Sequence, residues 1–261
     1  MTPKVSIIIP VFNKEKWIVQ TLQSVASQTY GNWECLIVDD GSTDKSLALI
    51  SSFTAGTKGN WKVVSRSNSG QGNARNVGIA HATGDLFAFL DADDLWLPEK
   101  LQVQVNLLDR QPEVDALISG YAIFRVGQVK KFRIVVHHSA ENMCKDWLTM
   151  RGFGGGLEST GIVRRIAYFA VGGFDESLST SAGLDLSLKL VTSRNLVVLP
   201  QPHALYRLSD DQWHKNEGKL REDAYTLARR YSEGLNGGRW CITCKRPSRR
   251  YGHASSERCY P

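Results

Sequence analysis

The chain has 261 residues, of which 42% are hydrophobic and 22% are charged, a composition typical of a soluble globular protein with one large domain. It begins without a secretion signal, and no window approaches the about 18 uninterrupted apolar residues of a membrane span, so we expect a cytoplasmic protein. The net charge of +6 divides into +1 for residues 1–235 and +5 for residues 236–261, where Glu257 opposes Arg239, Lys245, Arg246, Arg249, Arg250 and Arg258. The basic character therefore belongs to the tail, and it gives no reason to expect nucleic acid as a ligand of the main domain.

The first third of the chain alternates between strand-like and helix-like segments. Residues 5–12 form an apolar run rich in β-branched residues, which is typical of a strand buried on both faces. Apolar residues then recur at three- and four-residue steps from Trp17 to Ala26, which predicts a helix. The same reading gives a strand at 33–39, a helix at 43–53 and a strand at 61–65. This order predicts an α/β fold with a parallel sheet and right-handed crossovers.

The turn after the first strand, residues 13–16, contains no glycine. A dinucleotide-binding fold would place Gly-x-Gly-x-x-Gly there, and a P-loop would end in Gly-Lys-Ser/Thr. Neither motif occurs in the chain, which argues against a dehydrogenase and against a P-loop phosphotransferase.

Acidic residues follow the second strand, which ends in Asp39 and Asp40 before Gly41. Residues 41–44 are equally well explained as a loop with a helix cap. For Asp40 we favour a functional role, because a carboxylate at this edge of a parallel sheet can accept hydrogen bonds from a base or a ribose.

A glycine-rich turn at residues 68–72 precedes the next helical pattern, with Arg75 one turn into it. Backbone N–H groups at a helix start and an arginine can both bind phosphate. A flexible loop with an ordinary surface arginine is the simpler explanation of this element taken alone.

Residues 87–90 are apolar and of strand length, and Asp91, Asp93 and Asp94 follow directly. Pro98 then indicates a helix start, so the carboxylates lie at the carboxyl end of a strand. Closely spaced Asp oxygens there suit a divalent ion that also contacts substrate phosphates. The alternative is a solvated Asp-rich turn.

The second half of the chain has a different pattern. Strand-like runs at 116–124 and 132–136 surround Gly127 and predict antiparallel strands added to the parallel half, where we expect the acceptor side. Residues 152–161 are rich in glycine and could form a mobile lid, and residues 172–176 resemble a structural turn. Two adjacent histidines, His137 and His138, are better explained as an exposed strand end than as metal ligands.

Taken together, these segments resemble the family 2 glycosyltransferases of GT-A fold over about residues 3–210. The motifs occur in the family's order: Pro10-Val-Phe-Asn13, Val38-Asp-Asp-Gly-Ser42, Asn68-x-Gly-x-x-x-Ala-Arg-Asn-x-Gly78, Phe89-Leu-Asp-Ala-Asp-Asp94 and Gly172-Gly-Phe-Asp-Glu176. The resemblance implies a mainly parallel, Rossmann-related sheet with helices on both faces and an inverting, metal-assisted transfer of a sugar from a nucleotide diphosphate donor, with a UDP-sugar favoured.

The resemblance also implies site residues. Asp40 would contact the base, Asp91 the ribose, and Asp93 a divalent Mn²⁺ or Mg²⁺ that bridges the diphosphate. The full set expected around the donor is Pro10, Phe12, Asn13, Asp39, Asp40, Gly70, Arg75, Asp91 and Ala92. The expected acceptor is a saccharide or a lipid-linked molecule, whose identity pocket-lining loops would decide.

The chain departs from the family where the catalytic base should stand. Relatives carry a Glu-Asp pair there, and the alignment of residues 174–190 places Ala182 and Gly183 at those positions. Two carboxylates remain candidates for the catalytic role, Glu158 from the glycine-rich segment and Asp185. In a helix the side chain of Asp185 would point about 200° away from that of residue 183.

Two further departures concern metal ligands and the tail. Ser209 stands where many relatives have a metal-binding His, and His214 is the nearest substitute, although a surface His explains it equally well. Beyond a helix at 218–235, Cys241, Cys244, His253 and Cys259 could form a zinc site, but their spacing matches no common zinc motif.

The sequence thus predicts one GT-A-like domain over residues 1–235, divided into a donor half (3–114) and an acceptor half (115–235). Residues 236–261 would form a flexible basic tail able to touch anionic lipid. Two other classes stay open: a transferase-like binding or regulatory protein without turnover, and a nucleotidyltransferase that uses the same Asp-metal chemistry.

Overall fold

The computed structural model describes residues 2–125, 133–135, 139, 156–178, 181–208 and 217–231. In chain order the elements are β1 (Val5–Val11), α1 (Ile18–Ala26), β2 (Trp33–Asp39), α2 (Ser46–Gly56), β3 (Trp61–Ser65), α3 (Gln71–Ala80), β4 (Leu86–Phe89), β5 (Leu95–Trp96), α4 (Lys100–Arg110), β6 (Ala116–Arg125), β7 (Arg133–Val135), α6 (Leu157–Thr160), β8 (Gly161–Arg164), α7 (Arg165–Ala170), α8 (Ala182–Ser193), β9 (Leu196–Leu208) and α9 (Glu217–Tyr231).

Four parallel strands form the first half of the sheet, in the order β3-β2-β1-β4. Every residue of β1 is buried, which explains why its sequence is continuously apolar rather than alternating. The predicted strands at 33–39 and 61–65 are confirmed to the residue. The helix predicted at 43–53 begins instead at Ser46, because the Asp44 carboxylate accepts the Ser46 N–H (2.9 Å) in the turn that precedes it.

The second half of the sheet is mixed. β8 runs antiparallel to β4 and β6, and the expected antiparallel pairing around Gly127 is present as β6 with β7. However, β6 also pairs in parallel with the long β9, and β9 carries β5 at its other edge. Parallel pairing of strands so far apart in the chain has no local sequence signal, which is why the sequence predicted only antiparallel additions.

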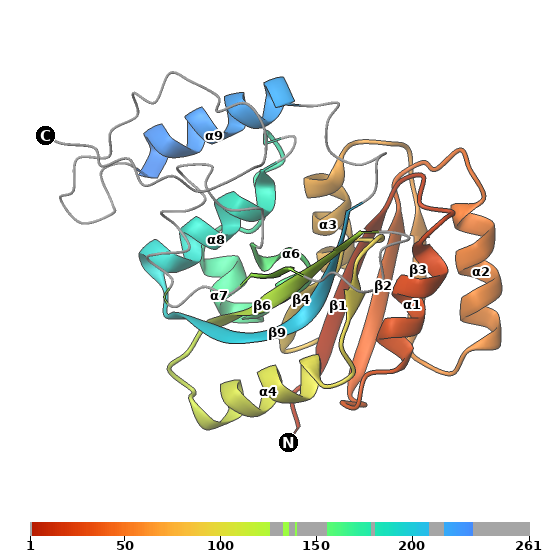
Figure 1. Ribbon diagram of the computed structural model, residues 1–261, viewed down its shortest axis with the longest axis horizontal. Helices are drawn as coiled ribbons and strands as arrows, with labels where there is room; N and C mark the ends of the chain where they lie inside the picture. Colours follow the sequence, from red (N-terminus) through yellow and green to blue (C-terminus); the bar gives the residue numbers. More distant parts are fainter. Residues whose placement is uncertain are drawn as a thin grey trace, which may run out of the picture.

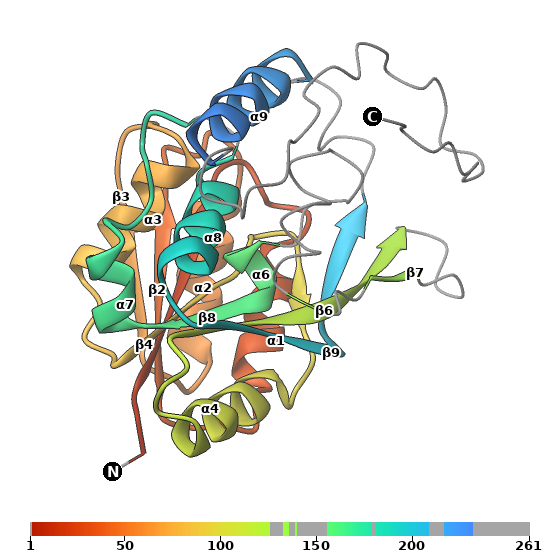
Figure 2. The same cartoon turned by 90° about the vertical axis from the view of Figure 1, so that its left-hand side faces the viewer.

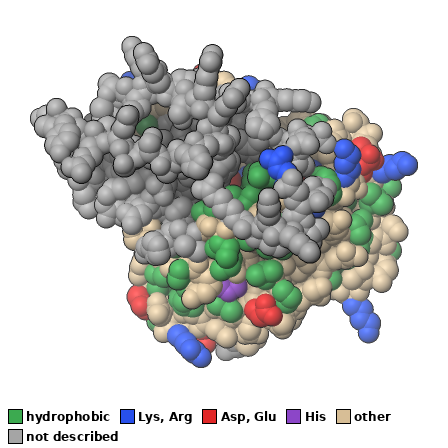
Figure 3. All heavy atoms as spheres, in the orientation of Figure 1, with side chains coloured by type: hydrophobic (Ala, Val, Ile, Leu, Met, Phe, Trp, Pro, Cys, Tyr) green, Lys and Arg blue, Asp and Glu red, His purple; other side chains and the backbone are tan. Residues whose placement is uncertain are grey.

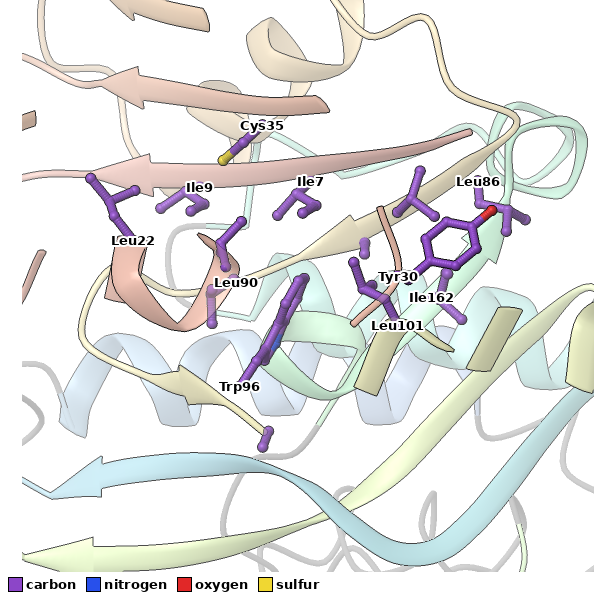
Figure 4. Packing of buried hydrophobic residues seen from close by; sticks show 14 of the residues in the cluster. Ile7, Ile9, Leu22, Tyr30, Cys35, Leu86, Leu90, Trp96, Leu101 and Ile162 are labelled. Carbon is purple, nitrogen blue, oxygen red and sulfur yellow. The ribbon is translucent and has the colours of Figure 1, made fainter. Parts of the chain in front are cut away.

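The sheet separates two apolar cores (Figures 1 and 2). On one face, α1 and α4 cover the side chains of Ile7 and Ile9; on the other, α3, α7 and α8 cover those of Ile8 and Phe89. In the first core Trp96 points inward beside Leu90 (Figure 4). The fold is therefore a three-layer α/β arrangement with a mostly parallel sheet, as the sequence predicted.

The described surface carries charges of both signs around its rim, without a patch of one sign on the face that Figure 3 shows. Among the described helices, none is long and apolar enough to cross a membrane. Cys35 is buried in the first core and packs there as a small apolar residue, whereas the four residues of the possible zinc site lie outside the described residues.

Candidate functional site

Polar loops follow the neighbouring strands β1, β2 and β4 at one edge of the sheet. Val11 pairs with Asp39, so β1 and β2 end at the same level, whereas β4 ends at Phe89, which pairs with Ile8. The loops after all three parallel strands leave the same edge of the sheet (Figure 1). Asn13, Asp40 and Asp91 follow the strand ends within two residues. The carboxyl edge of a parallel sheet is the usual ligand-binding edge, and the sequence-predicted residues meet there.

Asn13 connects the loops after β1 and β2. Its backbone adopts a φ of +52°, its side-chain oxygen accepts the Thr43 N–H (2.8 Å), and its own N–H donates to the Ser42 hydroxyl (3.0 Å). Asn tolerates this left-handed conformation better than most residues. Pro10 is buried within β1, whereas 44% of Phe12 is exposed at the start of the loop. Of these three residues, Phe12 and Asn13 are exposed and Pro10 is buried.

Asp40 clamps the glycine-rich turn before α3. Its carboxylate accepts the N–H groups of Ser69 (3.1 Å) and Gly70 (2.8 Å), and Arg66 lies 3.5 Å away. Gly70 has a φ of +94°, a conformation that glycine adopts readily and that turns its N–H toward Asp40. The neighbouring Asp39 is also buried, and its Oδ1 has no hydrogen-bond partner among the described residues. Asp39 Oδ1 is thus a buried acceptor that the described part of the chain leaves unused.

The acidic segment after β4 collects negative charge in a buried place. Asp93 and Asp94 are nearly fully buried, and the side chain of Asp91 is 28% exposed. Burial, together with the charges of Asp93 and Asp91, raises the pKa of Asp94 well above its usual range. Ala92 between them is buried, and its carbonyl accepts the Thr21 hydroxyl (3.0 Å), so it anchors the backbone of the segment.

Three partners compensate this charge. The Lys14 ammonium forms an ion pair with Asp93. Arg207 donates through its Nε to the Asp93 carbonyl (2.6 Å) and through its backbone N–H to Asp94 (3.0 Å). The hydroxyl of Ser159 donates to Asp94 (2.6 Å). No local sequence signal identifies these partners, because Lys14 lies in an ordinary turn after β1 and Arg207 arrives through the long-range pairing of β9.

The Asp93 carboxylate fits a hard divalent cation, because it already binds a cation, the Lys14 ammonium, at the ligand-binding edge. Among the described residues, no three side chains of His, Cys, Asp or Glu are grouped so that they could hold a metal ion. Mg²⁺ in nucleotide sites is usually held by one or two carboxylates and by substrate phosphates, and Asp93 would be such a carboxylate. His214 lies outside the described residues.

Arg75 lies beneath the acidic segment and is only 1% exposed. Its Nη2 donates to Asp91 (2.6 Å), its Nη1 lies 3.6 Å from Glu158, and its guanidinium stacks 5.4 Å from the Phe174 ring centre. The guanidinium is therefore shared between two carboxylates rather than presented to open space. It holds Asp91 and Glu158 on either side of one positive charge.

Glu158 stands beside Gly183, the position where the resemblance leads us to expect a carboxylate. A Cβ built on Gly183 would overlap the Glu158 carboxylate. The Gly183 N–H, at the start of α8, donates to that carboxylate. The structure thus brings Glu158 together with Arg75 and Asp91.

Asp185 points elsewhere. It is fully buried, and its carboxylate accepts Arg230 Nη1 (2.8 Å) and the Tyr231 hydroxyl (2.8 Å) of α9, and pairs with Lys189 (2.7 Å). This ion-pair network holds α9 against α8. Asp185 therefore faces α9 and does not lie with the carboxylates at the strand ends. This agrees with the expectation that its side chain points about 200° away from that of residue 183.

Comparisons with known proteins identify relatives over most of the described chain. The sequence profile described as "Glycosyl transferase family 2" matches residues 6–169. An uncharacterised glycosyltransferase of Nostoc sp. is 44% identical over 114 residues, and the putative glycosyltransferase EpsE of Bacillus subtilis is 33% identical over 134 residues. These alignments cover 44% and 51% of this chain but only 35% and 48% of the two relatives. The chain thus spans half or less of their length.

Solved structures show the same fold. TarS of S. aureus in complex with UDP-GlcNAc superposes with a TM-score of 0.70 at 22% identity, over 88% of this chain and 67% of that chain. The mannosyltransferase PcManGT of Pyrobaculum calidifontis, in complex with GDP-Man and Mn²⁺, superposes with a TM-score of 0.69 at 18% identity, over 90% of this chain and 68% of that chain.

Proposed function

Since this chain belongs to glycosyltransferase family 2, we propose that it transfers a sugar from a nucleoside diphosphate donor to an acceptor hydroxyl. The observation that carries the proposal is that Asp40, Asp91 and Asp93 follow the carboxyl ends of β2 and β4, the two parallel strands that flank β1. A nucleotidyltransferase, or a protein that binds the nucleotide without turnover, would use the same residues, so the reaction products distinguish the three classes.

We assign the donor to the carboxyl edge of the sheet, over the loops that follow β1, β2 and β4. The base lies toward Asp39 and Asp40, because Asp39 Oδ1 is an unused buried acceptor and Asp40 fixes the turn beside it. The ribose lies toward Asp91, and Phe12 borders the opening. We favour uridine diphosphate, since TarS, the neighbour with a TM-score of 0.70, is described in complex with UDP-GlcNAc. PcManGT is described in complex with GDP-Man and Mn²⁺, so a GDP-sugar has to be compared with the UDP-sugars as a donor.

The diphosphate and its metal lie toward Asp93. Mn²⁺ or Mg²⁺ held by Asp93 would neutralise the charge that develops on the leaving diphosphate. Lys14 must release the carboxylate for this, and its ammonium then remains close enough to face the phosphates. His214 is the second protein ligand in this proposal.

The transfer is an in-line displacement with inversion. The acceptor oxygen attacks the anomeric carbon, the bond from that carbon to the diphosphate oxygen breaks, and the electron pair leaves on the diphosphate. A single displacement inverts the configuration. A saccharide or a lipid-linked molecule supplies the hydroxyl; a cytoplasmic protein could reach the latter through residues 236–261, whose net charge is +5 as counted above.

The test is incubation with UDP-glucose, UDP-GlcNAc and GDP-mannose in Mn²⁺, with chromatographic detection of nucleotide products. We expect release of a nucleoside diphosphate. The same protein is given glucose 1-phosphate with UTP, where release of pyrophosphate would identify a nucleotidyltransferase. Donor binding in calorimetry without any product would identify a protein that has lost turnover.

A further inference from the structure

Glu158 occupies the place of a side chain that residue 183 lacks. The overlap between its carboxylate and a Cβ built on Gly183 means that any larger residue at 183 would displace Glu158. Conversely, glycine at 183 is what admits the carboxylate to this position. The two residues lie on separate elements, the turn α6 and the helix α8, so they form a matched pair only in the folded protein.

The turn that carries Glu158 is held from several sides. Trp96 Nε1 donates to the Ser159 carbonyl (2.7 Å), and Gln104 Nε2 donates to the Thr160 carbonyl (2.8 Å). The buried Lys100 donates to the Gly161 carbonyl (3.3 Å). Ser159 itself has a φ of +56°, which is costly for a residue other than glycine and persists only where the surroundings enforce it. Such a fixed, strained turn is a feature of functional sites.

The Glu158 carboxylate is partly exposed and is linked to the acidic segment after β4. Its side chain is 21% exposed, and the Arg75 guanidinium joins it to Asp91. Only one arginine therefore separates Glu158 from the segment to which we assign the ribose and the diphosphate. A reacting hydroxyl beside the donor sugar would lie within reach of a carboxylate in this position.

We propose that Glu158 is the catalytic base of this protein, a role that has moved from helix α8 to the turn α6 and is possible only because residue 183 is glycine. This role rests on the proposed function. Glu158 takes the proton of the acceptor hydroxyl while the acceptor oxygen forms its bond to the anomeric carbon and the diphosphate leaves with the electron pair of the broken bond. The proton then passes from Glu158 to solvent.

A purely structural role makes different predictions. As a cap of α8 and a partner of Arg75, Glu158 would support folding, and glutamine could still accept the Gly183 N–H. Burial raises the pKa of Glu158, Arg75 lowers it and Asp91 raises it, with a net increase. A base must be ionised, so its raised pKa should appear as an acidic limb in the pH dependence of kcat.

The first test is Glu158→Gln, measured as nucleoside diphosphate release from the UDP-sugar that the native protein uses, with water as the acceptor. We expect a fall in kcat of about 10²- to 10⁴-fold, the size of general-base assistance, with donor Kd within about twofold and the acidic limb lost. Glu113→Gln, at an exposed position, is the matched control and should leave kcat unchanged. A Glu158→Gln protein that keeps native kcat would overturn the assignment.

The second test exchanges the two positions. Gly183→Asp alone should lower both Tm and kcat, because the new side chain collides with Glu158. Combining Gly183→Asp with Glu158→Ala removes the collision and returns a carboxylate from α8, so kcat should recover at least tenfold over Glu158→Ala alone. Recovery of Tm without recovery of kcat would show a packing pair and overturn the catalytic role. If the native protein released no nucleoside diphosphate from any donor, the proposed function would fail as well; native turnover with an inert Glu158→Gln change would refute the base alone.

Discussion

At the scale of single residues, the ion pair between Lys14 and Asp93 occupies the carboxylate to which we assign the metal. The side chain of Asp93 is 8% exposed and that of Lys14 is 23% exposed, so the pair is largely shielded from water. A lysine that neutralises a buried carboxylate also competes with a metal for it. We therefore predict that Lys14→Met lowers the free energy of unfolding by about 1–3 kcal/mol in the absence of donor. Added Mn²⁺ should raise the Tm of this variant by more than it raises the Tm of the native protein.

The exposed Lys58 provides the control, since Lys58→Met should change neither quantity. Asp93→Asn should abolish the Mn²⁺-dependent increase in Tm in both the native and the Lys14→Met backgrounds. An undiminished increase in Asp93→Asn would place the metal elsewhere.

At the scale of elements, β5, α4 and α6 act as one unit. Trp96 on β5 and Gln104 on α4 both donate to carbonyls of α6, and the Lys100 ammonium lies 4.2 Å from the centre of the Trp96 ring. Burial lowers the pKa of Lys100 well below its usual range. Trp96 is 3% exposed, so Trp96→Phe leaves the Ser159 carbonyl without its donor, at a cost of about 1–3 kcal/mol. We predict that this change lowers kcat about tenfold while donor Kd changes less than twofold, because the turn, and with it Glu158, loses its position.

Trp33→Phe is the matched control, since Trp33 packs edge-on against Trp61 in β3, away from α6. Steady-state kinetics and calorimetry of both variants separate the two outcomes. Equal effects on kcat from the two substitutions would mean that general stability, rather than the position of α6, governs the rate.

At the scale of the whole molecule, a buried carboxylate stabilises the end of the sheet where β1 and β2 begin, opposite the carboxyl ends that carry the site. Glu34 on β2 is fully buried and accepts hydrogen bonds from Lys62 (2.9 Å) and Ser6 (2.7 Å), and Lys4 lies 3.0 Å away. Burial acts to raise the pKa of Glu34, but hydrogen bonds from Lys62, Ser6 and Thr83 outweigh it and hold that pKa far below its usual range. The folded state thus binds fewer protons than the unfolded state, so this stabilisation is complete above the unfolded pKa of about 4.3 and is lost as pH falls toward the lower folded pKa.

We predict that Glu34→Gln lowers the free energy of unfolding by about 1–3 kcal/mol at pH 7, because the charged hydrogen bonds of a buried carboxylate are lost while the partly exposed lysines stay hydrated. The difference from the native protein should shrink below about pH 4, as Glu34 of the unfolded chain becomes protonated. Urea unfolding at a series of pH values measures this, and donor binding should be unaffected because Glu34 lies at the far end of β2 from Asp40. A pH-independent difference would show that the lost contacts are not ionic.

The sequence by itself determined the layered α/β fold, the strands at 33–39 and 61–65, and the positions of Asp40, Asp91 and Asp93. Each of these follows from neighbours in the chain: apolar runs define buried strands, and polar residues directly after them must lie at the strand ends. Only the tertiary structure decided that Arg207 supports the acidic segment, that Asp185 faces α9, and that Glu158 fills the space beside Gly183. These contacts join residues far apart in the chain, and their geometry depends on how β9, α8 and α9 pack, which no local pattern encodes. The sequence showed that residue 183 lacks a side chain and offered Glu158 and Asp185 as candidate carboxylates, but only the packing of two distant elements decided that Glu158 is the one beside Gly183.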